Sequence, residues 1–152
     1  MTRQIRIALA LAGSAGLLLA ALAFQHIGGM APCQLCIWQR WPHVVAFLGA
    51  MGLILPGPVW PLIGAAGTAT SGGIGIYHTG VERGWWPGPT SCSGGGDMSA
   101  LTPEQLLDRV LAAPVVRCDE VPWELLGLSM ASWNALLSLV LAALWLSALR
   151  RP

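Results

Sequence analysis

Four cysteines are the residues of this chain best suited to chemistry. Cys33 and Cys36 form a CxxC motif, whose disulfide closes a very small ring. This form is common in dithiol redox sites, where one sulfur stays open to attack and its thiol pKa is lowered. Cys92 and Cys118 are 26 positions apart. The motif favours thiol–disulfide exchange, although two structural disulfides are the simpler alternative, and four cysteines allow three pairings that sequence cannot rank.

The neighbours of the CxxC motif favour a reactive thiolate at Cys36. Pro32 precedes the motif, and a helix is expected to begin there, which places Cys36 in the first turn near partial positive charge. Arg40 follows four residues later on the same helical face and can stabilise the thiolate. The alternative for Arg40 is an interfacial anchor whose charged head reaches the headgroups.

Other redox and metal chemistries fit the spacing poorly. A four-cysteine zinc site would need two closely spaced pairs, which Cys92 and Cys118 do not provide. Covalent haem attachment needs His directly after the second cysteine, where this chain has Ile37. No glycine-rich dinucleotide loop follows a strand pattern. We therefore expect no metal site.

Composition places these cysteines in a membrane protein. The chain has 152 residues with eight basic and seven acidic side chains, where a soluble domain of this size carries about 38 charges. Residues 7–39, 41–81 and 125–149 contain no charge, and about 20 apolar residues suffice to cross a bilayer. The net charge of +1 offers no basic stripe, which excludes nucleic-acid binding as a main function.

Prolines divide the longest uncharged window into two helices. Pro56, Pro58 and Pro61 interrupt it near its middle, because proline removes a backbone donor and clashes with the preceding turn. The sequence thus predicts an all-α, integral membrane four-helix bundle in a single domain, 1–152. The expected spans are about 7–27, 41–56, 60–78 and 131–149.

The third span carries small residues at a spacing of four. Two ladders of this kind are Gly64, Thr68, Gly72 and Gly67, Ser71, Gly75. Because small residues let helix backbones approach closely, we expect this span to pack inside the bundle. The first span has a rival interpretation as a cleavable signal peptide ending near Ala21-Leu22-Ala23, but its apolar run exceeds the ~7–15 residues of a signal core.

Arginine placement indicates the orientation. Four arginines lie at the termini and four between the spans, but long loops are discounted and the first helix usually dominates. Both termini are therefore expected to be cytoplasmic, with extracytoplasmic loops at about 28–40 and 79–130. All four cysteines then lie where disulfides form and persist. In the second loop, residues 103–112 are predicted to be a helix, either on the membrane surface or packed on protein.

Histidines and tryptophans near the predicted membrane faces give weaker evidence of a functional role than the cysteines do. His78 ends the third span beside the CxxC face, where its imidazole could donate a hydrogen bond to a carbonyl ligand or only reach the headgroups. His26 and His43 flank the first outer loop and give a weaker functional signal than His78. Trp85, Trp86, Trp123 and Trp133 are interpreted as interfacial belt residues.

Together these residues resemble the DsbB family of bacterial inner-membrane disulfide bond formation proteins, across nearly the whole chain. The resemblance is carried by Phe24-Gln25-His26, by residues 32–40 with the CxxC motif and Arg40, by Tyr77-His78-Thr79, by Cys92, and by Cys118 leading into residues 123–128. It implies a multi-pass inner-membrane enzyme that reoxidises a periplasmic DsbA-like thiol oxidase and passes the electrons to ubiquinone or menaquinone.

The resemblance also implies roles for individual residues. Cys92 would form the mixed disulfide with the partner, and Cys118 would exchange with Cys33. Cys36, as thiolate, would contact the quinone, assisted by Arg40. His78 matches a family position near the quinone. Two alternatives remain: a vitamin-K-epoxide-reductase-like enzyme, which differs in cysteine order, and a non-catalytic membrane protein with structural disulfides.

Overall fold

The computed structural model describes residues 1–89, 102, 104 and 116–149. Its helices are α1 (Arg3–His26), α2 (Gln34–Ala46), which continues as the 3-10 helix η1 (Phe47–Leu53), α3 (Val59–Glu82) and α5 (Met130–Ser147). Two short strands, β1 (Glu124–Leu125) and β2 (Leu128–Ser129), pair as an antiparallel hairpin before α5. The predicted helix at residues 103–112 lies outside the described residues except for Glu104.

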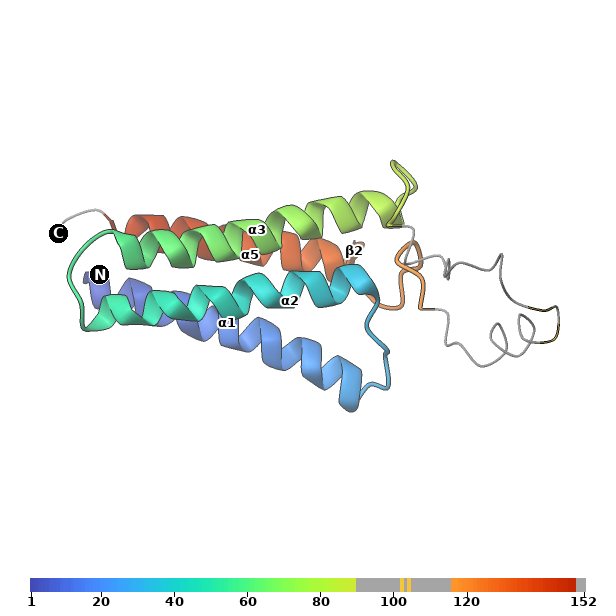
Figure 1. The fold of residues 1–152 in the computed structure, drawn as a ribbon, viewed down its shortest axis with the longest axis horizontal. Coiled ribbons are helices and arrows are strands. Elements are labelled where there is room, and N and C mark those ends of the chain that lie inside the picture. The colour runs from blue at the N-terminus through green and yellow to red at the C-terminus, as the bar shows by residue number, and fades with distance from the viewer. Residues whose placement is uncertain (90–101, 103, 105–115, 150–152) are drawn as a thin grey trace.

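The four helices form an elongated bundle (Figure 1). The N-terminus, the connection between η1 and α3, and the end of α5 lie at one end of the bundle, while the α1–α2 loop and the hairpin lie at the other. The chain runs from α2 to α3 through residues 54–58 without helix, and α3 starts directly after Pro58. The predicted proline break is thus confirmed, and so is the all-helical architecture.

Close approach through small residues places α3 inside the bundle. A Cβ on Gly64 would lie 2.4 Å from the Trp145 ring, and one on Gly67 would lie 2.6 Å from the carbonyl oxygen of Pro42. A Cβ on Gly75 would meet the backbone of Ala135 at 3.0 Å. The small-residue ladders therefore lie against α2 and α5, as predicted, and any larger side chain there would push the helices apart.

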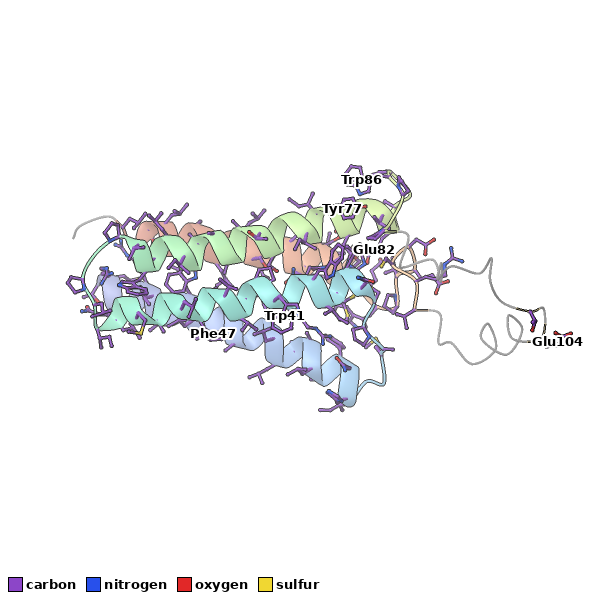
Figure 2. All side chains as sticks on the ribbon, in the orientation of Figure 1. Trp41, Phe47, Tyr77, Glu82, Trp86 and Glu104 are labelled. Atoms are coloured by element: carbon purple, nitrogen blue, oxygen red, sulfur yellow. The ribbon has the colours of Figure 1, made fainter. Side chains whose placement is uncertain are left out.

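Two helices have the length and apolarity to cross a membrane among the described residues, namely α1 and α5. Helix α2 has only 13 residues before it tightens into η1. Large apolar side chains are exposed on the surface of the bundle, among them Trp41 and Phe47, which are labelled in Figure 2. The exact bounds of the four spans remain a prediction.

Arginine side chains join the helices at the end of the bundle that contains the N-terminus. Arg3 donates to the carbonyl oxygens of Gly52, at 2.6 Å, and Gly57, at 2.9 Å. Arg6 donates to the carbonyl oxygen of Ser147 at the end of α5. These bonds satisfy carbonyls that helix ends leave without a partner, and they join α1 to η1 and α5.

Candidate functional site

The CxxC motif begins α2. Cys33 is the N-cap, and its Sγ accepts a hydrogen bond from the Cys36 backbone nitrogen at 3.3 Å. Cys36 lies in the first turn, so the predicted helix start at the motif is confirmed. The two sulfur atoms are 2.9 Å apart, beyond the ~2.05 Å of a disulfide, and both cysteines are free. The pair is therefore a dithiol.

The two thiols differ in their affinity for a proton. Cys36 lies before the predicted span at 41–56, and its pKa is lowered to about 7, first by the hydrogen bond from the Cys33 thiol, then by its backbone contact with Cys33 and by Arg40, while burial opposes the shift. The pKa of Cys33 is raised by the same hydrogen bond and by burial. Cys33 thus holds its proton more tightly, and Cys36 is the thiol of the pair that ionises first.

This difference predicts a pH dependence for alkylation of Cys36. Because its pKa is lowered to about 7, the thiolate should be about a tenth of the population at pH 6 and about nine-tenths at pH 8. The rate of reaction with iodoacetamide, followed by mass spectrometry of the Cys36 peptide, should rise with a midpoint near 7. In Cys33→Ala, which lacks the thiol donor, the midpoint should move upward. A wild-type midpoint at the ordinary thiol value would contradict this assignment.

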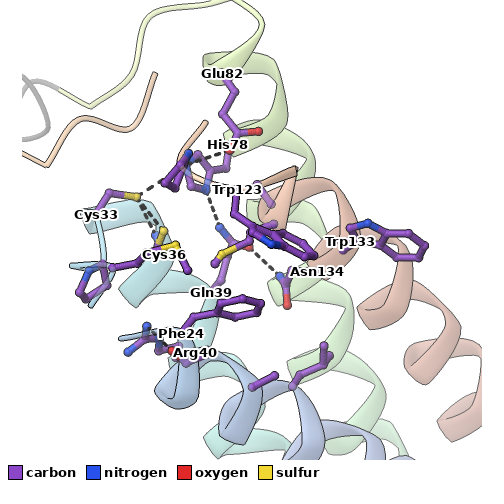
Figure 3. Close-up of a pocket in the computed structure, with 18 of the residues that line it drawn as sticks. Phe24, Cys33, Cys36, Gln39, Arg40, His78, Glu82, Trp123, Trp133 and Asn134 are labelled. Carbon is purple, nitrogen blue, oxygen red and sulfur yellow. Dashed lines mark hydrogen bonds and ion pairs between the residues drawn. The ribbon is translucent and has the colours of Figure 1, made fainter. Parts of the chain in front are cut away.

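His78 joins the dithiol from α3. Its Nε2 lies 3.6 Å from Cys33 Sγ and 3.9 Å from Glu82 Oε1, and its Nδ1 lies 2.8 Å from the amide nitrogen of Gln39 (Figure 3). Glu82 lies beyond the predicted third span, accepts a hydrogen bond from Ser129, and has its pKa raised by burial. The imidazole therefore lies between a sulfur, a carboxyl group and an amide.

The guanidinium group of Arg40 has one buried nitrogen atom, Nε, without a hydrogen-bond partner among the described residues. Its Nη1 donates to Gln25 Oε1 at 2.6 Å and its Nη2 to the carbonyl oxygen of Ala21 at 3.4 Å, which ties α2 to α1. The buried Nε has no hydrogen-bond partner among the described residues. Since a buried unpaired donor costs about 1–3 kcal/mol, Nε is poised to bind an acceptor that reaches it.

A cavity of about 360 Å³ opens beside these groups. Its lining is mainly apolar, from Leu17, Phe24, Trp123 and Leu137, and Phe24 and Trp123 have ring centroids 5.1 Å apart. The polar lining comes from Cys33, Cys36, Gln39, Arg40, His78 and Asn134. An apolar cavity with a few convergent polar groups is the usual form of a small-molecule site.

Four of the six predicted site residues thus line one cavity, namely Cys33, Cys36, Arg40 and His78. A fifth, Cys118, is buried in the same apolar cluster as Cys33 and is disulfide-bonded. The sixth, Cys92, lies outside the described residues. The motif on α2 and the end of the second loop are therefore neighbours in space, although 82 positions separate Cys36 from Cys118.

The sequence interpretation missed several polar residues here. Gln39 and Asn134 line the cavity, and so does His43, which is buried between Ser14 and Ser138 and does not flank a loop. Ionisable side chains within spans are expected to be functional by default, a signal that was present for His43.

Two tryptophans also need a different interpretation. Trp123 and Trp133 line the cavity, a place that their interpretation as interfacial belt residues did not include. Trp133 Nε1 also donates to the carbonyl oxygen of Leu125, which fixes the hairpin against α5. Trp123 directly precedes β1 of this hairpin.

The cluster of Cys33, Cys36 and His78 also has the donor set of a soft metal site, with three ligand atoms within 4.8 Å of one another. A histidine that binds a metal donates its other ring N–H to an acceptor. In this site the amide nitrogen of Gln39, a donor, lies against Nδ1 instead. The hydrogen bonding therefore favours thiol chemistry over metal binding.

The bundle and its site define a class of protein, the membrane-embedded thiol oxidoreductases. Comparison with known proteins narrows this class. The family model described as disulfide bond formation protein DsbB matches residues 3–148. The chain therefore belongs to the DsbB family, whose members are inner-membrane enzymes that generate disulfides.

Curated relatives agree with this assignment. The disulfide bond formation protein B of Pasteurella multocida is 35% identical over 91% of this chain and 84% of the relative. Disulfide bond formation protein B 2 of Pseudomonas aeruginosa is 38% identical over 84% of this chain and 83% of the relative. The disulfide bond formation protein B of Dechloromonas aromatica is 33% identical over 82% of this chain and 79% of the relative. No solved structure matches the chain.

Proposed function

We propose that this chain reoxidises a periplasmic DsbA-like dithiol protein and passes the electrons to ubiquinone or menaquinone. The observation that carries the proposal is the place of Cys36, whose thiol pKa is lowered to about 7, beside an apolar cavity lined by Arg40 with its unpaired Nε. A membrane dithiol needs an electron acceptor that is soluble in the bilayer, and a quinone fulfils this condition.

The cavity residues fit a quinone ring. Arg40 Nε would donate to a ring carbonyl oxygen, the group that this orphaned donor lacks. The rings of Phe24 and Trp123 form an apolar wall for the head group. When bound, a quinone supplies a two-electron, two-proton acceptor. Cys36 is the sulfur placed for it, because its thiolate is the nucleophilic form.

Exchange between the two cysteine pairs would deliver the electrons. In the proposed relay Cys92 takes the mixed disulfide with the partner, and Cys118 exchanges with Cys33, each attack breaking one S–S bond and forming another. The burial of Cys118 in the Cys33 cluster supports this second exchange. Overall, the partner dithiol loses two electrons and two protons, and the quinone gains both to become a quinol.

Topology follows from the same arrangement. We place the CxxC motif, Cys118 and the hairpin at the periplasmic end and Arg3 and Arg6 at the cytoplasmic end, with both termini cytoplasmic. The two groups lie at opposite ends of the bundle, which supports this orientation (Figure 1). The proposed spans keep the bounds predicted from the sequence.

The test is quinone reduction by the purified protein, followed optically, after addition of a reduced DsbA-like protein. We expect one quinone reduced per partner disulfide formed, and no reduction with the oxidised partner. If neither ubiquinone nor menaquinone were reduced with any of several partners, the proposal would be contradicted and structural disulfides would be favoured.

A further inference from the structure

A continuous series of hydrogen-bonded side chains crosses the interior of the bundle. From the dithiol inward its members are Cys33, His78, Gln39, Asn134, Ser138, His43 and Ser14, contributed by all four helices. The inner part of this series has no role in the proposed relay. Its donors and acceptors, however, decide which ring nitrogen of His78 carries the proton.

The orientation of the Gln39 amide is fixed by a carbonyl. Gln39 Nε2 lies 3.2 Å from the carbonyl oxygen of Leu35, which can only accept, so this atom must be the NH₂ group. The same nitrogen lies 2.8 Å from His78 Nδ1. Nδ1 must therefore accept the hydrogen bond, which leaves the ring proton of a neutral His78 on Nε2.

Asn134 holds this orientation from the other side. Its Nδ2 lies 2.7 Å from Gln39 Oε1 and 3.1 Å from Ser71 Oγ. The Ser71 hydroxyl donates its own proton to the carbonyl oxygen of Gln39 at 2.8 Å, so it accepts from Asn134. Ser138 donates to Asn134 Oδ1 at 3.3 Å. The bonds from Ser138 to Asn134, from Asn134 to Gln39 and from Gln39 to His78 therefore all run toward His78.

The surroundings of His78 Nε2 match a protonated nitrogen. Cys33 Sγ lies 3.6 Å away and Glu82 Oε1 3.9 Å away, and both can accept. The backbone of Cys118 also forms a hydrogen bond with this ring. The Cys33 thiol donates its hydrogen bond to Cys36, so its sulfur presents lone pairs to other donors. One lone pair accepts the Cys36 backbone N–H, and the other is left for Nε2–H.

We propose that Gln39 and Asn134 are positioning residues that hold His78 with its proton on Nε2, so that the imidazole donates a hydrogen bond to the Cys33 sulfur. In this state His78 cannot remove the proton of Cys33. It instead stabilises negative charge on Cys33 whenever that sulfur is a thiolate. This consequence for disulfide exchange rests on the proposed function, whereas the position of the proton does not.

The experiment is ¹⁵N NMR of the purified, reduced protein with labelled histidine. The chain has three histidines, so the spectrum is simple, and His78→Gln identifies the His78 signals. We expect His78 to show a protonated Nε2 and an unprotonated Nδ1. A protonated Nδ1 in the wild type would overturn the proposal, with no partner or quinone involved.

Two variants separate positioning from general packing. Asn134→Leu removes the donor that orients Gln39 and should convert His78 from one tautomer to a mixture, with turnover about tenfold lower. Ser138→Ala is the matched control, one turn further along α5, because it leaves the Asn134–Gln39–His78 bonds in place and should keep the wild-type tautomer. An unchanged tautomer in Asn134→Leu would exclude Asn134 as a positioning residue. If quinone turnover fails while the tautomer is as expected, only the proposed function is wrong.

Discussion

Replacing Cys36 with Ser is expected to lower quinone reduction at least 10³-fold. A serine hydroxyl has no accessible anionic form near neutral pH and cannot form a disulfide with Cys33, so both functions of the Cys36 sulfur are lost. The structure gives Cys36 the lowered pKa of the pair, to about 7, and a place in the cavity lining. The measurement is steady-state quinone reduction with reduced partner protein.

The matched control for this variant is Gln34→Ser, which introduces the same side chain within the motif but keeps both thiols. Its turnover should remain within a few-fold of the wild type. If Cys36→Ser retained more than about one per cent of the wild-type rate, a limit set well above the expected 10³-fold loss, Cys36 would not lie on the electron path.

For Arg40→Ala we expect kcat/KM for quinone to fall about 100-fold. The change removes the unpaired Nε donor and the positive charge that helps to lower the pKa of Cys36. A hydrogen bond to a charged group contributes about 1.5–3 kcal/mol, and a 100-fold change is about 2.7 kcal/mol. The measurement is the initial rate at varied quinone concentration, with the partner saturating.

Arg40→Lys separates charge from geometry. Lysine keeps the positive charge but lacks the planar fork that reaches Gln25 and the cavity together. We expect the alkylation midpoint of Cys36 to stay near that of the wild type, while quinone binding remains weakened. Unchanged quinone kinetics in Arg40→Ala would leave Arg40 as an interfacial anchor only.

Much of the fold could be predicted because the bilayer imposes simple rules. The uncharged windows and the prolines around Gly57 predicted the helical segments. The small-residue ladders predicted the close packing of α3. The hairpin could not be foreseen, because its turn places Leu126 at φ 55° and Gly127 at φ 76°. A left-handed leucine is unfavourable for the isolated chain, and only tertiary contacts such as the Trp133–Leu125 hydrogen bond hold it there.

The candidate site divides in the same way. Cys33, Cys36 and Arg40 are close in sequence, so helical spacing alone puts them together. The assignment of His78 to the site depended on the resemblance to the DsbB family. Gln39 and Asn134 are 95 positions apart, and their contact exists only because α2 and α5 are both packed against α3. No local sequence pattern predicts a contact between Gln39 and Asn134. The direction of their hydrogen bond is set only when the bundle is assembled.

The short helix α2 has a consequence for how the protein is made. Among the described helices only α1 and α5 are long and apolar enough by themselves to cross a membrane, and α2 carries the buried polar groups of Gln39 and His43. His43 is satisfied only when Ser14 of α1 and Ser138 of α5 have both arrived. Because α5 is translated last, the growing chain holds a CxxC helix whose Gln39 and His43 still lack their α5 partners, Asn134 and Ser138. Biogenesis should therefore couple completion of the chain to stable insertion of the CxxC segment.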